Sequence, residues 1–215
     1  MKPDRLNAFT DGVIAIIITI MVLELPTPRG GDLAALRPDL TLFGAYALSF
    51  INVGIYWNNH HHMMQAAKRI DGPVLWANLF LLFWLSLFPF VIRWIGEVGL
   101  IAMPVAAFGV VLLLAGAAYQ LLERALITAE GEDSGVGKAV GGRTKEWLSV
   151  ALYVAAVGLA FVSPWISVAI YLCVSAMWLV PTGGSSATCA ASRRIPPQFQ
   201  RSTLWKTGTE RPSSA

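Results

Sequence analysis

The chain has 215 residues, of which 55% are hydrophobic and only 13% are charged. Because a soluble domain carries about 25% charged residues, this composition excludes an ordinary soluble protein and indicates an integral membrane protein. The formal net charge of +3 argues against nucleic acid as a partner, since phosphate binding needs a clustered basic face. Two cysteines are too few for a disulfide framework.

Six apolar segments predict an all-α fold with six transmembrane helices, since one span needs about 20 residues. They cover residues 7–25, 40–66, 73–95, 99–121, 146–163 and 165–181. Pro26 and Pro28 should end the first helix, because proline removes a donor and blocks the preceding turn. The short last two segments share Ser163-Pro164 and predict a tight helical hairpin.

Two polar segments lie outside these helices. Residues 129–145 combine acidic residues, glycines and then basic residues, which predicts a loop. Residues 182–215 are rich in Ser, Thr, Gly, Pro and Arg, which predicts a disordered basic tail with anionic lipid as a candidate contact. The predicted organisation is therefore a six-span domain at 1–181 and a tail at 182–215.

Charge bias predicts the orientation of the chain in the membrane. If the N-terminus is cytoplasmic, thirteen of the 16 Lys and Arg residues fall in cytoplasmic segments. Only Arg29, Arg37 and Arg93 fall on the outside. This asymmetry predicts a multi-pass protein of the cell membrane with both termini in the cytoplasm.

A polar and aromatic cluster, Arg5, Phe9, Thr10 and Asp11, opens the first helix. Ionisable groups inside a span cost roughly 2.5–3.5 kcal/mol on insertion scales, so Asp11 needs a physical reason. One interpretation is a helix-end charge that faces the lipid headgroups. The other is a buried carboxylate held by hydrogen bonds to a neighbouring helix.

The second segment offers candidate partners in YWNNHHHMM. Trp57 and His60 are three residues apart and share a helix face. All three histidines of the chain lie here, which makes a metal site conceivable. Adjacent histidines point in different directions, however, and no cysteine or paired carboxylates accompany them. We therefore expect a structural hydrogen-bond network or an interfacial belt, and no bound metal.

The first helix also carries an apolar stripe, because Ile16, Thr19, Ile20 and Leu23 follow the i, i+3, i+4, i+7 spacing. Such a stripe usually packs against a neighbour. In a symmetric oligomer it could instead line a central hole, where hydrophobic rings gate by dewetting. Gly109 and Gly116 interrupt the fourth segment and are expected to allow close helix packing.

No enzyme is predicted, since the chain lacks a phosphate loop, a nucleophile elbow and a zinc-binding His-Glu-x-x-His helix. Two other hypotheses stay open besides a pore shared by several copies of the chain. One is a proton-coupled secondary transporter that uses Asp11 and His60. The other is a non-conducting scaffold whose first helix only packs.

The opening motif of the first helix resembles that of a known family. Arg5-x-x-x-Phe9-Thr10-Asp11 is similar to the Arg-x-x-x-Phe-Ser-Asp signature of the transmembrane protein 175 family of potassium channels. Thr10 departs from the usual serine, but it keeps the hydroxyl. The added methyl group is expected to shift the local packing.

The resemblance extends over residues 1–181. It includes the apolar continuation of the first helix, Trp57-x-x-His60, the positions of Asn78 and Pro89, and the six-span layout. Like the family, the chain lacks the carbonyl filter of ordinary potassium channels. Residues after Pro181 match nothing in the family.

The resemblance implies a function and an assembly. Prokaryotic members carry one six-span repeat and form homotetramers, so four copies of this chain would enclose one pore. The family's narrowest isoleucine falls on Ile16, and further pore-facing positions fall on Thr19 or Ile20 and on Leu23. The resemblance thus implies a passive potassium-permeable cation channel that needs no cofactor, with potassium ions, the lipid bilayer and its own copies as partners.

Overall fold

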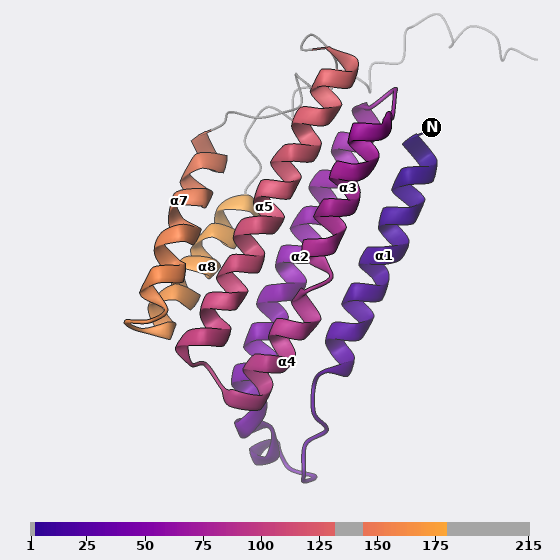
Figure 1. The fold of residues 1–215 in the computed structure, drawn as a ribbon. Coiled ribbons are helices and arrows are strands. Elements are labelled where there is room, and N and C mark those ends of the chain that lie inside the picture. The colour runs from indigo at the N-terminus through magenta and orange to yellow at the C-terminus, as the bar shows by residue number, and fades with distance from the viewer. Residues whose placement is uncertain (1–2, 132–143, 180–215) are drawn as a thin grey trace, which may run out of the picture. The chain divides into compact units, whose positions relative to one another are not determined.

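The structure is a computed structural model that describes residues 3–131 and 144–179. Helices are the only regular elements in this part of the chain, which confirms the predicted all-α fold (Figure 1). In chain order they are α1 (Pro3–Leu23), the 3₁₀ helix η1 (Leu33–Asp39), α2 (Leu40–Ala66), α3 (Gly72–Leu85), α4 (Phe88–Val98), α5 (Ala102–Glu130), α7 (Thr144–Leu159) and α8 (Pro164–Leu179). The predicted tail at 182–215 lies outside the described residues.

The helices form one bundle with α5 near its centre (Figure 1). Helix α5 packs against α3 and α4 on one side and against α7 and α8 on the other. Helix α1 packs against α2, α3 and α4, at the edge of the bundle away from α7. The first helix therefore has one face in contact with its own bundle and one face that no described helix covers.

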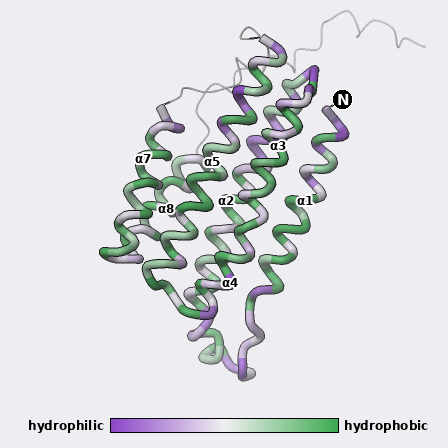
Figure 2. The backbone as a smooth tube through the Cα atoms, in the orientation of Figure 1, coloured by the Kyte–Doolittle hydropathy of each residue, from purple (hydrophilic) through white to green (hydrophobic). Residues whose placement is uncertain are grey.

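Four helical segments are long and apolar enough to cross a membrane: Pro3–Leu23, Leu33–Ala66, Gly72–Val98 and Ala102–Glu130. Figure 2 shows hydrophobic residues along these helices and hydrophilic residues gathered near their ends. Helices α7 and α8 have 16 residues each and form the predicted hairpin around Ser163-Pro164. All six predicted segments are helical.

The third predicted segment is two helices rather than one. Helix α3 ends at Leu85 and α4 begins at Phe88, with Ser86 and Leu87 between them. Pro89 explains the interruption, because it has no N–H for the carbonyl of Leu85 and its ring crowds the preceding turn. The break allows α4 to take its own direction after α3.

The fourth predicted segment was too short, because α5 continues to Glu130 and therefore into the predicted 129–145 loop. The extra turns carry Glu130 to the connection between α2 and α3. There its carboxylate accepts hydrogen bonds from the backbone N–H groups of Lys68 and Arg69, the second at 3.0 Å. The rest of the predicted loop, residues 132–143, lies outside the described residues.

One of the two glycines in α5 is required by close packing. A Cβ atom at Gly109 would overlap the hydroxyl of Tyr171 and lie 2.8 Å from Cγ2 of Val157. Tyr171 is held in place, because its hydroxyl donates to the Val105 carbonyl at 3.1 Å. Gly116 differs, since a Cβ there would meet only the Tyr56 hydroxyl at an ordinary 3.5 Å.

We predict that Gly109→Ala lowers the stability of the subunit by about 1–3 kcal/mol, the usual range for overpacking a core. Gly158→Ala in α7 is the matched control, because a Cβ there meets nothing within 4 Å. That control should be neutral or stabilising by up to about 1 kcal/mol, since alanine favours the helix. Thermal unfolding of both variants in detergent makes the comparison, and equal midpoints would contradict the predicted overlap.

Candidate functional site

Helix α1 has two distinct faces. Its buried stripe is Leu6, Thr10, Ile14, Ile17 and Met21, spaced three or four residues apart. This spacing places all five on one side of a helix, where they meet α2, α3 and α4. The buried stripe fixes which way the other side chains of α1 point.

The predicted pore stripe lies on the uncovered face of α1. Ile16 is 58% exposed, Ile20 is 41% exposed and Leu23 is 80% exposed in the single chain. Thr19 is also exposed, and its hydroxyl donates to the Ile16 carbonyl at 2.8 Å. The hydroxyl hydrogen of Thr19 is thus used within the helix, while its oxygen lone pairs stay available on the uncovered face.

A buried chain of hydrogen bonds connects α1, α3 and α2. Nδ2 of Asn78 donates to Oγ1 of Thr10 at 2.9 Å, and Oδ1 of Asn78 lies 2.8 Å from Nε2 of His60. All three side chains are buried. Because the amide nitrogen is the donor to Thr10, the amide oxygen is an acceptor, and this assigns the histidine hydrogen to Nε2.

A second contact joins α1 to α2 beside this buried chain. Nε1 of Trp57 donates to Oδ1 of Asp11 at 2.8 Å. The indole ring also stacks on His61, with ring centroids 5.7 Å apart. Asp11 thus has a hydrogen-bond partner on the neighbouring helix, although its side chain is only partly buried.

The predicted signature cluster is divided by the helix. Thr10 and Asp11 contact neighbouring helices, whereas Arg5 is exposed and Phe9 is 51% exposed. Among the described residues, Arg5 makes no hydrogen bond or ion pair within the chain. The signature residues are expected to hold the first helix against the second through Trp57 and His60, and for Arg5 and Phe9 this stays a prediction. Thr10 itself bonds to α3, and it reaches His60 only through Asn78.

The histidine run separates into residues with different surroundings. His60 is buried in the chain just described, whereas His62 is exposed. Nε2 of His61 lies 2.8 Å from Nε2 of Gln65, four residues further along α2. Within residues 3–131 and 144–179, no three His, Cys, Asp or Glu side chains come together in a way that could hold a metal ion.

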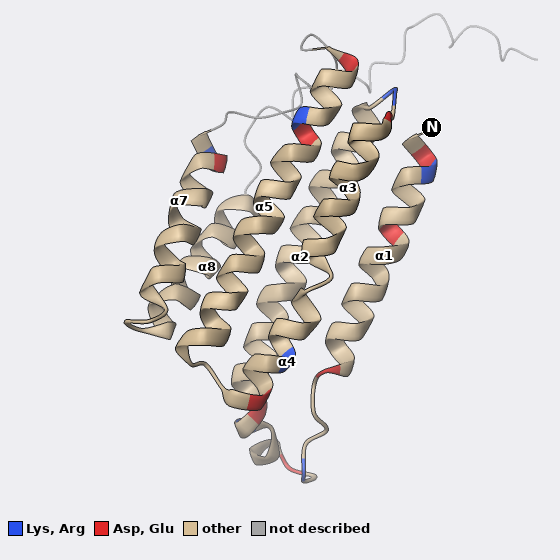
Figure 3. Cartoon of the chain, viewed as in Figure 1, with Lys and Arg blue, Asp and Glu red and all other residues tan. Residues whose placement is uncertain are grey.

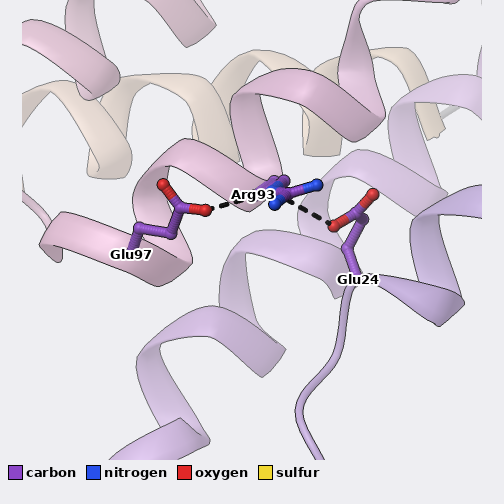
Figure 4. A network of polar contacts seen from close by, with 3 residues as sticks. All are labelled: Glu24, Arg93 and Glu97. Atoms are coloured by element: carbon purple, nitrogen blue, oxygen red, sulfur yellow. Dashed lines mark hydrogen bonds and ion pairs between the residues drawn. The ribbon is translucent and has the colours of Figure 1, made fainter.

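The opposite end of α1 is joined to α4 by charged side chains that the sequence interpretation missed (Figure 4). Nε of Arg93 lies 3.9 Å from Oε2 of Glu24 and 3.0 Å from Oε1 of Glu97. Glu24 directly follows Leu23, the last residue of α1. The available signal was the isolated arginine at 93 inside an apolar segment, because such a charge is expected either to pair or to reach the membrane surface.

Asn78 was noticed in the sequence only as part of a resemblance and not as a member of the site. It is the residue that connects the other two members of the buried chain. A single amide within the apolar run VLWANLFLL is a signal for such a role, because a buried amide without partners is costly.

Comparisons with known proteins identify the family of this chain. The family model described as endosomal/lysosomal potassium channel TMEM175 matches residues 5–89, which include all but the first two residues of α1 and the whole of α2 and α3. A protein of Chryseobacterium sp. (strain P1-3) named a potassium channel is 49% identical over 181 residues. That match covers 84% of this chain and 94% of the relative. The chain belongs to the TMEM175 family.

Other members of the TMEM175 family are more distant. A Chamaesiphon minutus protein named a potassium channel is 29% identical over 182 residues, covering 77% of this chain and 88% of that one. The human protein named endosomal/lysosomal proton channel TMEM175 is 35% identical over 81 residues, covering 32% of this chain and 16% of the human one.

The TMEM175 fold is also found by comparing structures. The crystal structure of a lysosomal potassium-selective channel TMEM175 homolog from Chamaesiphon minutus superposes with a TM-score of 0.66 at 23% identity. The superposition covers 82% of this chain and 96% of that chain. The helical layout of this chain is therefore that of the TMEM175 family.

We predict that Thr10→Val destabilises the subunit because the buried Nδ2 of Asn78 loses its acceptor. Thr10→Ser keeps the hydroxyl and serves as the control. Membrane hydrogen bonds average about 0.6 kcal/mol and reach about 1.7 kcal/mol, so we expect a coupling of about 1 kcal/mol between Thr10 and Asn78. The coupling is measured from the free energies of unfolding in detergent of Thr10→Val, Asn78→Leu and the double variant. Strictly additive losses of stability would contradict the hydrogen bond.

We predict that Asp11→Ala reduces folding or assembly yield more than Asp11→Asn does, because the amide keeps an acceptor oxygen for Trp57. Trp57→Phe should lower the yield similarly, and Asp11→Ala should add little in that background. Size-exclusion yield and ion flux are measured for each variant. An Asp11→Asn protein that assembles normally but conducts nothing would instead favour a proton-coupled carrier.

Proposed function

We propose that this chain is the subunit of a homotetrameric, passive, potassium-permeable cation channel whose pore is lined by α1. The observation that carries this proposal is the uncovered apolar stripe of α1, on a helix whose other face is bonded to its own bundle. Membership of the TMEM175 family, with a potassium channel as a relative at 49% identity, supports it.

The geometry of α1 supports a shared pore rather than a pore within one chain. A single helix cannot enclose a path, so several copies must meet around an axis with the same face inward. Closed cyclic symmetry satisfies this requirement without leaving an unpaired edge. Four copies would place rings of Ile16, Ile20 and Leu23 along the axis, with the Thr19 hydroxyls between them.

These rings would act as a hydrophobic constriction. Apolar rings control conduction through their width and wetting, because they supply no ligands that replace the hydration shell of the ion. The proposed channel therefore needs no cofactor, and ions move down their gradient. Its selectivity depends on how tightly the four copies of α1 approach at Ile16.

Charges support an orientation with the N-terminus in the cytoplasm of a cell membrane. Figure 3 shows that charged residues lie mainly toward the ends of the helices. Arg5 lies in the first turns of α1, and the α2–α3 connection holds Lys68 and Arg69. Arg93 lies toward the opposite end, near the last turn of α1. Under the positive-inside rule, the end with more Lys and Arg is the cytoplasmic one.

The experiment that tests the function is a current recording from the purified protein in a bilayer, with potassium on one side and sodium on the other. Ohmic currents are expected, with a reversal potential that indicates a higher permeability for potassium than for sodium. A proton gradient applied across the same bilayer tests whether the protein also conducts protons, because the human relative is named a proton channel. Saturable flux that depends on a second gradient would contradict a channel and favour a transporter.

Assembly is tested on the same preparation. Native mass spectrometry in mild detergent should give a tetramer as the main species, since the proposed pore needs four copies of α1. Only monomers or dimers under conditions that preserve conduction would contradict the proposed stoichiometry.

We predict that Ile16→Asn raises the current and weakens the preference for potassium over sodium, because polar amides would wet the constriction. Val22→Asn is the matched control. It is also an exposed apolar residue of α1, but it lies about 120° around the helix from Ile16. Tetramers with unchanged conductance and reversal potential in Ile16→Asn would remove Ile16 from the pore.

A further inference from the structure

The charged contact between α1 and α4 is expected to contribute little to the stability of the bundle. The side chains of Arg93 and Glu97 are 63% and 62% exposed in the single chain, and Glu24 is 25% exposed. Exposed ion pairs contribute little to stability, because water screens them and because ordering the side chains costs entropy. The contact matters for its position in the molecule and not for its contribution to stability.

That position is the outer end of the helix proposed to line the pore. Glu24 follows Leu23, the most exposed member of the pore stripe, and its N–H still bonds to the Ile20 carbonyl at 3.3 Å. Its backbone thus continues the helical turn, and its carboxylate points to α4, one residue beyond the last side chain of the pore stripe. In a cyclic assembly, each copy would bring one such carboxylate to the mouth of the pore, beyond the ring of Leu23.

Arg93 is the cation that accompanies this carboxylate. It comes from α4, which the break at Ser86 and Leu87 separates from α3. The same guanidinium also bonds Glu97 one turn later, which holds the side chain along its own helix. Arg93 therefore stands between two carboxylates, and removing its charge would leave both uncompensated.

We propose that Arg93 sets the conductance of the channel by partly neutralising Glu24 at the outer mouth of the pore. This inference rests on the proposed function, because it needs α1 to line the pore. A ring of like charges at a pore entrance changes the local concentration of the permeating ion. With Arg93 in place, the carboxylate ring attracts cations weakly; without it, the attraction is stronger.

The experiment compares Arg93→Gln with wild type by whole-cell recording, in which the extracellular side of the channel is known. Current carried by cations entering from outside should rise about twofold or more at low ionic strength, because charge screening is then weak. The increase should disappear in about 1 M salt, where the Debye length falls to about 3 Å. Outward current should change less.

Three further variants separate electrostatics from structure. Arg93→Lys keeps the charge and should behave like wild type, whereas Glu24→Gln should lower inward current in a salt-dependent way. Arg37→Gln is the matched control, because Arg37 is an exposed arginine on η1 that forms no ion pair among the described residues. It should leave the inward current close to that of wild type.

The outcomes are distinguishable from a failure of the proposed function. If wild type carries no potassium current, the channel proposal itself fails. If wild type conducts but Arg93→Gln is unchanged, or is altered equally at low and high salt, the mouth-charge proposal is overturned. Equal effects of Arg37→Gln and Arg93→Gln would overturn it as well, since any outer arginine would then suffice.

Discussion

The rotation of α1 about its own axis determines which of its side chains are left uncovered, and within the buried stripe the hydrogen bond from Asn78 to Thr10 makes that rotation specific. Apolar side chains on both sides of α1 could exchange places at little cost in lipid, because lipid tails are as apolar as leucine. A buried hydroxyl and a buried amide cannot, since each needs a partner where no water is present. The polar pair therefore specifies which face of α1 is left uncovered.

The two ends of α1 are held by different kinds of interaction. Near its start, buried groups and the Trp57–Asp11 bond link it to α2 and α3. Near its end, the exposed Arg93–Glu24 contact adds a charged link to the packing of α1 against α4. Buried hydrogen bonds are insensitive to salt, whereas exposed ion pairs are screened by it. Salt can thus weaken the charged contact at the end of α1, but not the buried hydrogen bonds near its start.

Much of the fold followed from local rules in the sequence. Runs of apolar residues located all six helical segments, and Ser163-Pro164 located the hairpin. The interruption before Pro89 and the continuation of α5 to Glu130 were missed. Hydropathy averages over a proline in an apolar run, and it ends a segment where polar helix formers begin. In both cases the helix boundary is set by backbone hydrogen bonding, which hydropathy does not measure.

The site was harder to predict, because its partners are far apart in the chain. The spacing of Ile16, Thr19, Ile20 and Leu23 was enough to place them on one face, since periodicity is a local property. Periodicity alone could not decide which neighbour the opposite face would meet. Thr10 bonds to α3 rather than directly to His60 because Asn78 lies between them. Such an arrangement depends on helix packing, which no single segment encodes.

The separations of these contacts along the chain also bear on the order of events during synthesis. The partners of α1 are α2, α3 and α4, which all lie before residue 99. By contrast, Glu130 is 62 and 61 residues away from its partners, Lys68 and Arg69, in the connection between α2 and α3. Asn52 and its partner Ser175 are 123 residues apart. Domains fold from the N-terminus as the ribosome delivers them. The proposed pore helix can therefore complete its contacts first, and α5, α7 and α8 are added to a unit that is already oriented.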